Sequence, residues 1–181
     1  GLGGLVGVNN GLLGTVTSSF WDKTVGGPDN GLGTALSTSQ MKQRSTFEST
    51  GWDFTGTPPV WFIFERISYP ILFGLPIPIN SISTLQAMST VVSGNFYLTQ
   101  DLDASETINW TGKKNAPGFL PIGTTSQPFN GTLDGRGHYI RGLHIYRPAL
   151  DNVGLFGCLG SSDLVRAGAH RRLHAGDRDV G

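Results

Sequence analysis

The stretch Phe96-Tyr97-Leu98-Thr99-Gln100-Asp101-Leu102-Asp103 decides the fold that the sequence predicts. Phe96, Leu98 and Leu102 fall on one face of an extended chain, and polar residues fall on the other face. Alternation of this kind is typical of a strand with one buried side. Further on, Ile140-Arg141-Gly142-Leu143-His144-Ile145 alternates in the same way until the period slips at Gly142. A glycine at such a slip indicates a bend between two short strands.

Composition agrees with short strands and tight turns. The 181 residues include 27 glycines, and only 14% of the residues are charged. A helical bundle needs charged outer faces, whereas glycine suits sharp corners between strands. The formal net charge is zero, so we expect no nucleic-acid partner.

The cysteine and hydropathy patterns exclude two further classes. Cys158 is the single cysteine, so the chain cannot form an internal disulfide or a thiolate metal site. No apolar run approaches the ~20 residues of a membrane span, and we expect no membrane insertion by this segment. The chain begins inside what looks like a repeat, so we interpret it as a piece of a longer protein.

Two short helices are also expected. In residues 36–41, Ser37 is a candidate N-cap and Gln40 would close a capping box. In the similar residues 82–87, Ser83 is the candidate N-cap and Gln86 would close the capping box.

An echo of one motif points to a repeat. Gly4-Leu5-Val6-Gly7 near the start returns as Gly154-Leu155-Phe156-Gly157 near the end, and Ser19-Phe20-Trp21-Asp22-Lys23-Thr24 follows the first copy. With these motifs the chain resembles GLUG-repeat surface proteins of bacteria, of the filamentous-haemagglutinin and autotransporter-like kind. The resemblance covers most of residues 2–160, although residues 58–66 are more apolar than the pattern.

The resemblance implies an architecture and a division of the chain. The expected fold class is all-β, a right-handed parallel β-helix, or solenoid, with one or two short capping helices. Residues 1–73 would be the end of a repeat array with its closing module, and residues 74–81 a proline-rich linker. Residues 82–160 would begin a second β-helix module. Residues 161–181 crowd arginine and histidine and are expected to be a disordered or frame-shifted tail.

Few residues are candidates for a chemical site. Asp101 and Asp103 project from one strand face and are weak candidates for a calcium site, the alternative being a solvated strand face. Trp110 is a weak candidate for contact with a carbohydrate, whereas Trp21 and Trp52 are interpreted as packed cap residues. Asp134 lacks the second carboxylate that glycosidase chemistry needs and is better explained as a turn residue. No catalytic residue and no cofactor is predicted.

The expected function is therefore non-catalytic. We expect a structural or adhesive segment of a secreted or cell-surface bacterial protein, located outside the cell. Its partners would be host or matrix surface molecules, either protein or glycan. A carbohydrate-binding or carbohydrate-cleaving β-helix, and the repeat region of a larger surface protease, are the alternatives.

Overall fold

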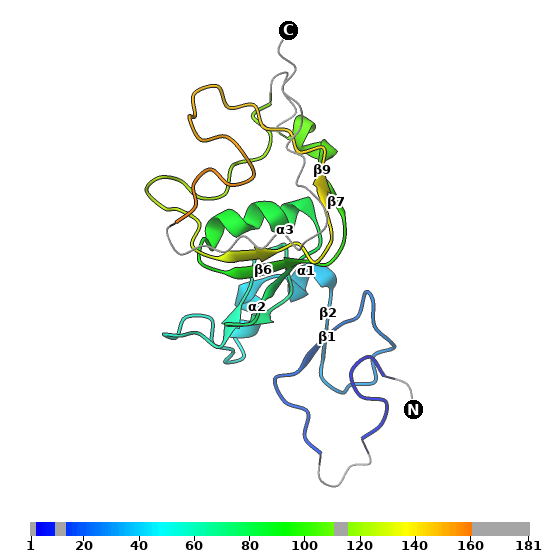
Figure 1. Ribbon diagram of the computed structural model, residues 1–181. Helices are drawn as coiled ribbons and strands as arrows, with labels where there is room; N and C mark the ends of the chain where they lie inside the picture. Colours follow the sequence, from blue (N-terminus) through cyan, green and yellow to red (C-terminus); the bar gives the residue numbers. More distant parts are fainter. Residues whose placement is uncertain (1–2, 10–13, 111–115, 161–181) are drawn as a thin grey trace. The chain divides into compact units, whose positions relative to one another are not determined.

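The computed structural model describes residues 3–9, 14–110 and 116–160, and the predicted tail at 161–181 lies outside them. The chain divides into two compact units, residues 1–73 and 74–181. Figure 1 shows the elements of each unit along the chain.

The first unit contains short elements only. Strands β1 (Phe20–Asp22) and β2 (Thr34–Leu36) pair in parallel. Helices α1 (Thr38–Met41) and α2 (Arg44–Glu48) follow, and β3 (Trp61–Phe62) pairs antiparallel with β4 (Ile71–Leu72).

Aromatic side chains form the core of this unit. Phe47 of α2 is fully buried and packs with Phe54 and Ile63. Trp52 stacks on Trp61 with ring centroids 4.2 Å apart. The rings are nearly parallel, with an interplanar angle of 22°, so the two indoles stack face to face within this core.

The two tryptophans that were interpreted as cap residues are packed in different ways. Trp21 is 6% exposed, and a Cβ placed on Gly4 would lie 2.2 Å from its ring. Gly4 therefore lies flat against the indole, where any larger residue would clash. Trp52 is half-buried, and its indole N–H donates to the carbonyl of Ser18 at 3.2 Å.

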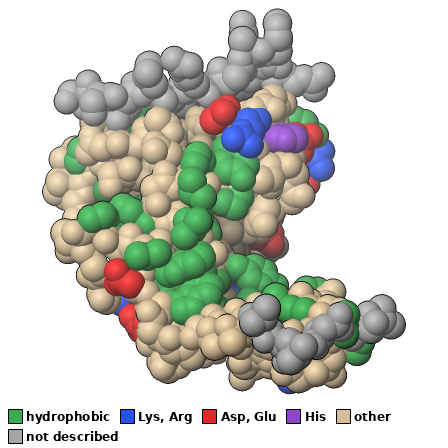
Figure 2. Space-filling view, turned by 90° about the horizontal axis from the view of Figure 1, so that it is seen from below, with side chains coloured by type: hydrophobic (Ala, Val, Ile, Leu, Met, Phe, Trp, Pro, Cys, Tyr) green, Lys and Arg blue, Asp and Glu red, His purple; other side chains and the backbone are tan. Residues whose placement is uncertain are grey.

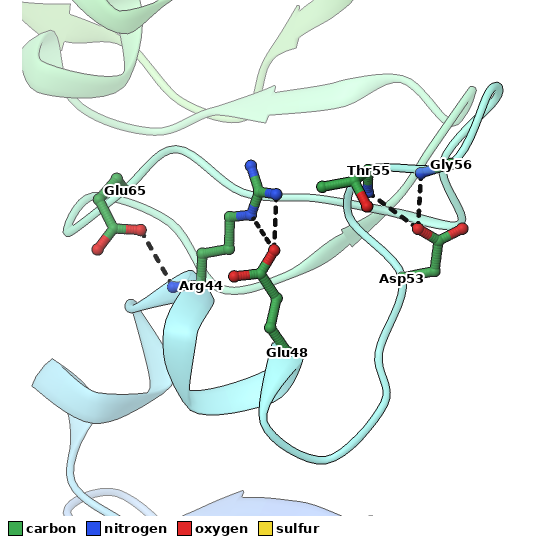
Figure 3. Close-up of polar contacts among 6 residues, drawn as sticks. All are labelled: Arg44, Glu48, Asp53, Thr55, Gly56 and Glu65. Carbon is green, nitrogen blue, oxygen red and sulfur yellow. Dashed lines mark hydrogen bonds and ion pairs between the residues drawn. The ribbon is translucent and has the colours of Figure 1, made fainter.

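Helix α2 is held by charged contacts at its surface (Figure 3). The Arg44 guanidinium pairs with Glu48 one turn along the helix at 2.6 Å, and the Arg44 backbone N–H donates to Glu65 at 3.0 Å. Next in the chain, Asp53 accepts from the N–H groups of Thr55 and Gly56. These contacts close the turns around the aromatic cluster.

Asp22 ties β1 to a distant part of its own unit. Tyr69 donates its hydroxyl to the Asp22 carboxylate at 2.6 Å, and the Thr24 N–H donates at 2.8 Å. Burial raises the pKa of Asp22, but hydrogen bonds from Thr38, Tyr69 and Thr24 outweigh it and lower this pKa to about 2.

The second unit is built around a small parallel sheet. Strands β5 (Ile77–Ile79), β6 (Asn95–Leu98) and β8 (Thr132–Asp134) lie side by side in that order. Strands β7 (Leu102–Asp103) and β9 (Ile140–Arg141) form a second parallel pair, seen together in Figure 1. The unit also holds α3 (Ile82–Ala87) and the 3-10 helices η1 (Met88–Thr90) and η2 (Ser105–Asn109).

The alternation read from the sequence accounts for the core of this unit. Phe96, Leu98 and Leu102 are buried, as their spacing predicts. Helix α3 contributes Leu85, and Phe119 and Phe129 come from later in the chain; all three are fully buried. Ile77 and Ile79 are buried as well, so part of the segment that was expected to be a linker is the strand β5.

The expected all-β, right-handed parallel β-helix is wrong. The described residues form four separate small sheets, one of them antiparallel, together with three α-helices and two 3-10 helices. The spacing along the chain explains the difference. Hydrogen bonds that link β5 to the end of β6 span 20 residues, whereas those that link β6 to β8 span 37. A continuous solenoid needs a uniform repeat, which this chain does not keep.

The two helix starts were predicted with unequal success. Ser37 caps α1 and Gln40 closes the capping box, which confirms the first prediction. The second is wrong, because α3 is capped by Ser81 and its box is closed by Thr84. Gln86 instead exchanges hydrogen bonds with the backbone of Leu120, at 3.0 and 2.8 Å.

The acid sensitivity of the first unit follows from Asp22. A carboxyl with a lower pKa in the folded than in the unfolded chain stabilises the fold above its ordinary pKa, and this stabilisation is lost as the pH falls toward the folded value. We therefore expect Asp22→Asn to lower the melting temperature at pH 7. The difference from wild type should shrink between about pH 5 and pH 2.

Thermal unfolding followed by circular dichroism across this pH range measures the effect. Asp151→Asn, at an exposed position, is the control and should leave the profile unchanged. A constant gap between Asp22→Asn and wild type at all pH values would contradict the assignment.

Candidate functional site

The most distinctive surface of the second unit is a set of four side-chain pairs, which we call the polar ladder. Two of the pairs join residues of paired strands, and the other two include residues just beyond the strand ends. Each pair joins a residue of the segment 95–103 to one of the segment 132–141. The four pairs are Asn95–Thr132, Tyr97–Arg136, Asp101–His138 and Asp103–Arg141.

The strand register explains why two pairs of the ladder lie opposite one another. Phe96 lies opposite Leu133 and Leu102 opposite Ile140, and these four apolar side chains are buried. Their neighbours along each strand must then point outward. Parallel pairing brings Asn95 beside Thr132 and Asp103 beside Arg141.

Two of the pairs join a carboxylate to a basic side chain. Asp101 lies 3.2 Å from His138 Nδ1 and accepts the Tyr139 N–H at 3.2 Å, while Asp103 receives the Arg141 guanidinium at 2.9 Å. Burial tends to raise the pKa of Asp101, yet the hydrogen bonds from Tyr139 and His138 hold it below its ordinary value. Hydrogen bonds from Ser105, aided by Arg141, likewise lower the pKa of Asp103. Both carboxylates are thus kept ionised.

A third pair places a cation on an aromatic ring. The Arg136 guanidinium lies 3.6 Å from the centroid of the Tyr97 ring. Arg136 has φ +47°, a left-handed conformation that few side chains adopt, and its N–H donates to Asp134 at 2.9 Å. The turn therefore holds the guanidinium over the ring despite the local conformational cost.

The arrangement suits binding. The ladder offers carboxylates, cations, an amide, a hydroxyl and one aromatic ring on adjacent strands, and the charges within it are paired. Figure 2 shows acidic, basic and histidine side chains beside one another on the face that it draws. Carboxylates with lowered pKa values suit charge pairing, whereas a general acid at neutral pH requires a raised value.

The structure brings both calcium candidates into the ladder. Asp101 and Asp103 each have a basic partner, and a cation would have to compete with it. Among the residues described, no group of three or more histidine, cysteine, aspartate or glutamate side chains could hold a metal ion. The calcium site stays a prediction.

The other candidate residues lie elsewhere. Trp110 ends η2, is half-buried and packs on Phe119 with ring centroids 6.2 Å apart. His144 is half-buried, and its backbone N–H donates to Thr107 Oγ1 at 2.8 Å. The carbohydrate contact at Trp110 also stays a prediction.

Sequence reasoning singled out Asp101 and Asp103 but predicted none of the four pairs. The signal that could have found them is the spacing of Gly94 and Gly131. Each glycine precedes an alternating strand, and the paired side chains Asn95–Thr132 and Asp101–His138 are separated by 37 residues.

No family model matches the chain, and no solved structure matches it. It is 40% identical over 96 residues to Halomucin of Haloquadratum walsbyi, which covers 50% of this chain and 1% of that protein. It is 49% identical over 72 residues to a putative Gly-rich membrane protein of Evansella cellulosilytica, which covers 38% of this chain and 8% of that protein. The chain thus spans only a small share of each relative. Neither name indicates a GLUG repeat.

None of the helices among the described residues has both the length and the apolar character that a bilayer crossing requires.

A double-mutant cycle tests the contact between Tyr97 and Arg136. Because a cation over a partly exposed ring contributes about 0.5–1 kcal/mol, we expect this coupling energy from Tyr97→Ala, Arg136→Ala and the double variant in urea unfolding. Tyr97→Ala combined with Arg141→Ala is the control and should be additive. Additivity in the first cycle would show that the ring and the guanidinium do not interact.

Proposed function

We propose that the chain is a non-catalytic region of a surface- or membrane-associated protein, and that its polar ladder contacts protein or glycan outside the cell. The observation that carries the proposal is the ladder itself: four exposed or half-buried pairs, two of which lie opposite one another in the strand register beside a buried apolar row.

The two relatives support the coarse part of this proposal. One is named Halomucin and the other a putative membrane protein, and a mucin-type name and a membrane name both point toward the cell boundary. The chain corresponds to a small part of each relative, so their names say nothing of its activity. The adhesive role is the finer part and rests on the ladder.

The geometry of the ladder supports binding to a polar partner. Its pairs Asp101–His138 and Asp103–Arg141 are exposed or half-buried, so they are accessible to hydrogen-bonding groups of a ligand. Paired charges limit non-specific attraction to strongly acidic or basic surfaces. Amide, hydroxyl and carboxylate groups in a row suit the hydroxyl-rich surface of a glycan or the polar rim of a protein interface.

A non-catalytic role also agrees with what the carboxylates do. Each of three aspartates accepts a hydrogen bond from a backbone N–H. Asp103 and Asp134 accept it from the residue two positions later, and Asp101 accepts it from Tyr139. These bonds fix turns and strand ends, which is the use that such residues have in turns.

Labelling of intact cells tests the proposed location. Antibodies raised against the 181-residue chain are applied to the organism that encodes it, before and after permeabilisation. We expect labelling of intact cells and its loss after brief treatment with an external protease. An antibody against a cytoplasmic marker is the control. Labelling that appears only after permeabilisation would contradict the proposal.

A further inference from the structure

One surface turn of the second unit carries a sequence motif that overlaps the ladder at Thr132 and has a use of its own. Asn130-Gly131-Thr132 is an Asn-x-Thr triplet, the acceptor pattern for N-linked sugars. It lies between Phe129, which is fully buried, and the start of β8. Such triplets occur by chance, so the geometry of the asparagine must show whether the folded chain can accommodate a sugar at this position.

The backbone of this turn is fixed, while the side chain of Asn130 is exposed. The Asn130 N–H donates to Val92 O at 2.7 Å, and the preceding Phe129 N–H donates to Cys158 O at 2.9 Å. The Asn130 side chain is exposed; its Nδ2 donates to Pro128 O at 3.2 Å, and its Oδ1 lies close to Gly160.

The amide can be modified without loss of that bond. A primary amide nitrogen carries two hydrogens, and an N-linked sugar replaces one of them. The remaining N–H can still donate to Pro128. The folded turn therefore tolerates a sugar on Asn130 Nδ2.

We propose that Asn130 is a site of N-linked glycosylation. This inference rests on the proposed function, because the modification occurs on exported chains. The donor is a sugar activated as a lipid-linked phosphate ester. Asn130 Nδ2 attacks the anomeric carbon, the N–C bond forms, the C–O bond to phosphate breaks, and the nitrogen loses one proton. The lipid-linked phosphate is the leaving group.

The hydroxyl of Thr132 gives the order of events. In the folded chain it donates to Asn95 Oδ1 at 2.9 Å within the ladder. The transferase must recognise that hydroxyl before it is engaged by Asn95. The sugar is therefore transferred before β8 pairs with β6. The finished glycan then lies next to the Asn95–Thr132 pair at one end of the ladder.

The chain contains a matched control. Asn30-Gly31-Leu32 is also an exposed asparagine followed by glycine, but it has leucine where the acceptor triplet requires serine or threonine. A second triplet begins at Asn109, and its Thr111 lies outside the described residues. Asn109→Gln is therefore included in all chains compared.

The test is secretion of the full chain from a yeast, followed by peptide mapping in a mass spectrometer. We expect the Asn130 peptide to carry a sugar. An N-glycan amidase, which hydrolyses the side-chain amide bond, should release this sugar and convert Asn130 to aspartate. The modification should vanish in Asn130→Gln and Thr132→Ala and persist in Thr132→Ser. Asn30 should stay unmodified unless Leu32→Thr is introduced.

In the Leu32→Thr chain, a sugar on Asn30 shows that the host can glycosylate this protein. If Asn130 of that chain then carries no sugar, the proposal is overturned. Secretion from yeast tests the acceptor site alone. Labelling of the native cells tests the location, so the two failures are distinguishable.

Discussion

The second unit depends on one close approach between two glycines. A Cβ added to Gly131 would lie 2.0 Å from the carbonyl oxygen of Gly94, and that same oxygen accepts the Thr132 N–H at 3.1 Å. Only glycine allows the two backbones to come so near. The contact sets the parallel register of β6 and β8, and β7 and β9 pair in parallel further along the same two segments. Burial of Phe96 and Leu133, and the outward position of their neighbours, follow from it.

The polar ladder is a consequence of that register. Once apolar residues face inward on both strands, each outward residue meets a partner on the next strand. Ionic pairs at the surface add little stability by themselves, so the ladder is better understood as a surface for contact than as a support for the fold. A glycan on Asn130 would lie beside its Asn95–Thr132 pair and extend the polar character of this surface.

The burial of single strand residues and one helix start were predictable from sequence, whereas the pairing of the strands was not. Alternation correctly placed Phe96, Leu98 and Leu102 inside, and the capping box correctly placed the start of α1. The all-β solenoid failed because two copies of a four-residue motif do not establish a uniform repeat, and the loops between strands differ in length. The ladder was missed because cross-strand partners 37 residues apart depend on a register that the Gly94–Gly131 contact fixes in three dimensions.

The account is tested most directly by comparing the unfolding free energies of Gly131→Ala and Gly135→Ala. The two glycines flank the same strand, but a Cβ on Gly135 would meet only the His138 carbonyl at an ordinary 3.6 Å. Gly131→Ala should destabilise the chain by about 1–3 kcal/mol, the usual effect of overpacking, and Gly135→Ala should stay within about 0.5 kcal/mol of wild type. Equal stability of the two variants would contradict the claim that the Gly94–Gly131 contact sets the register.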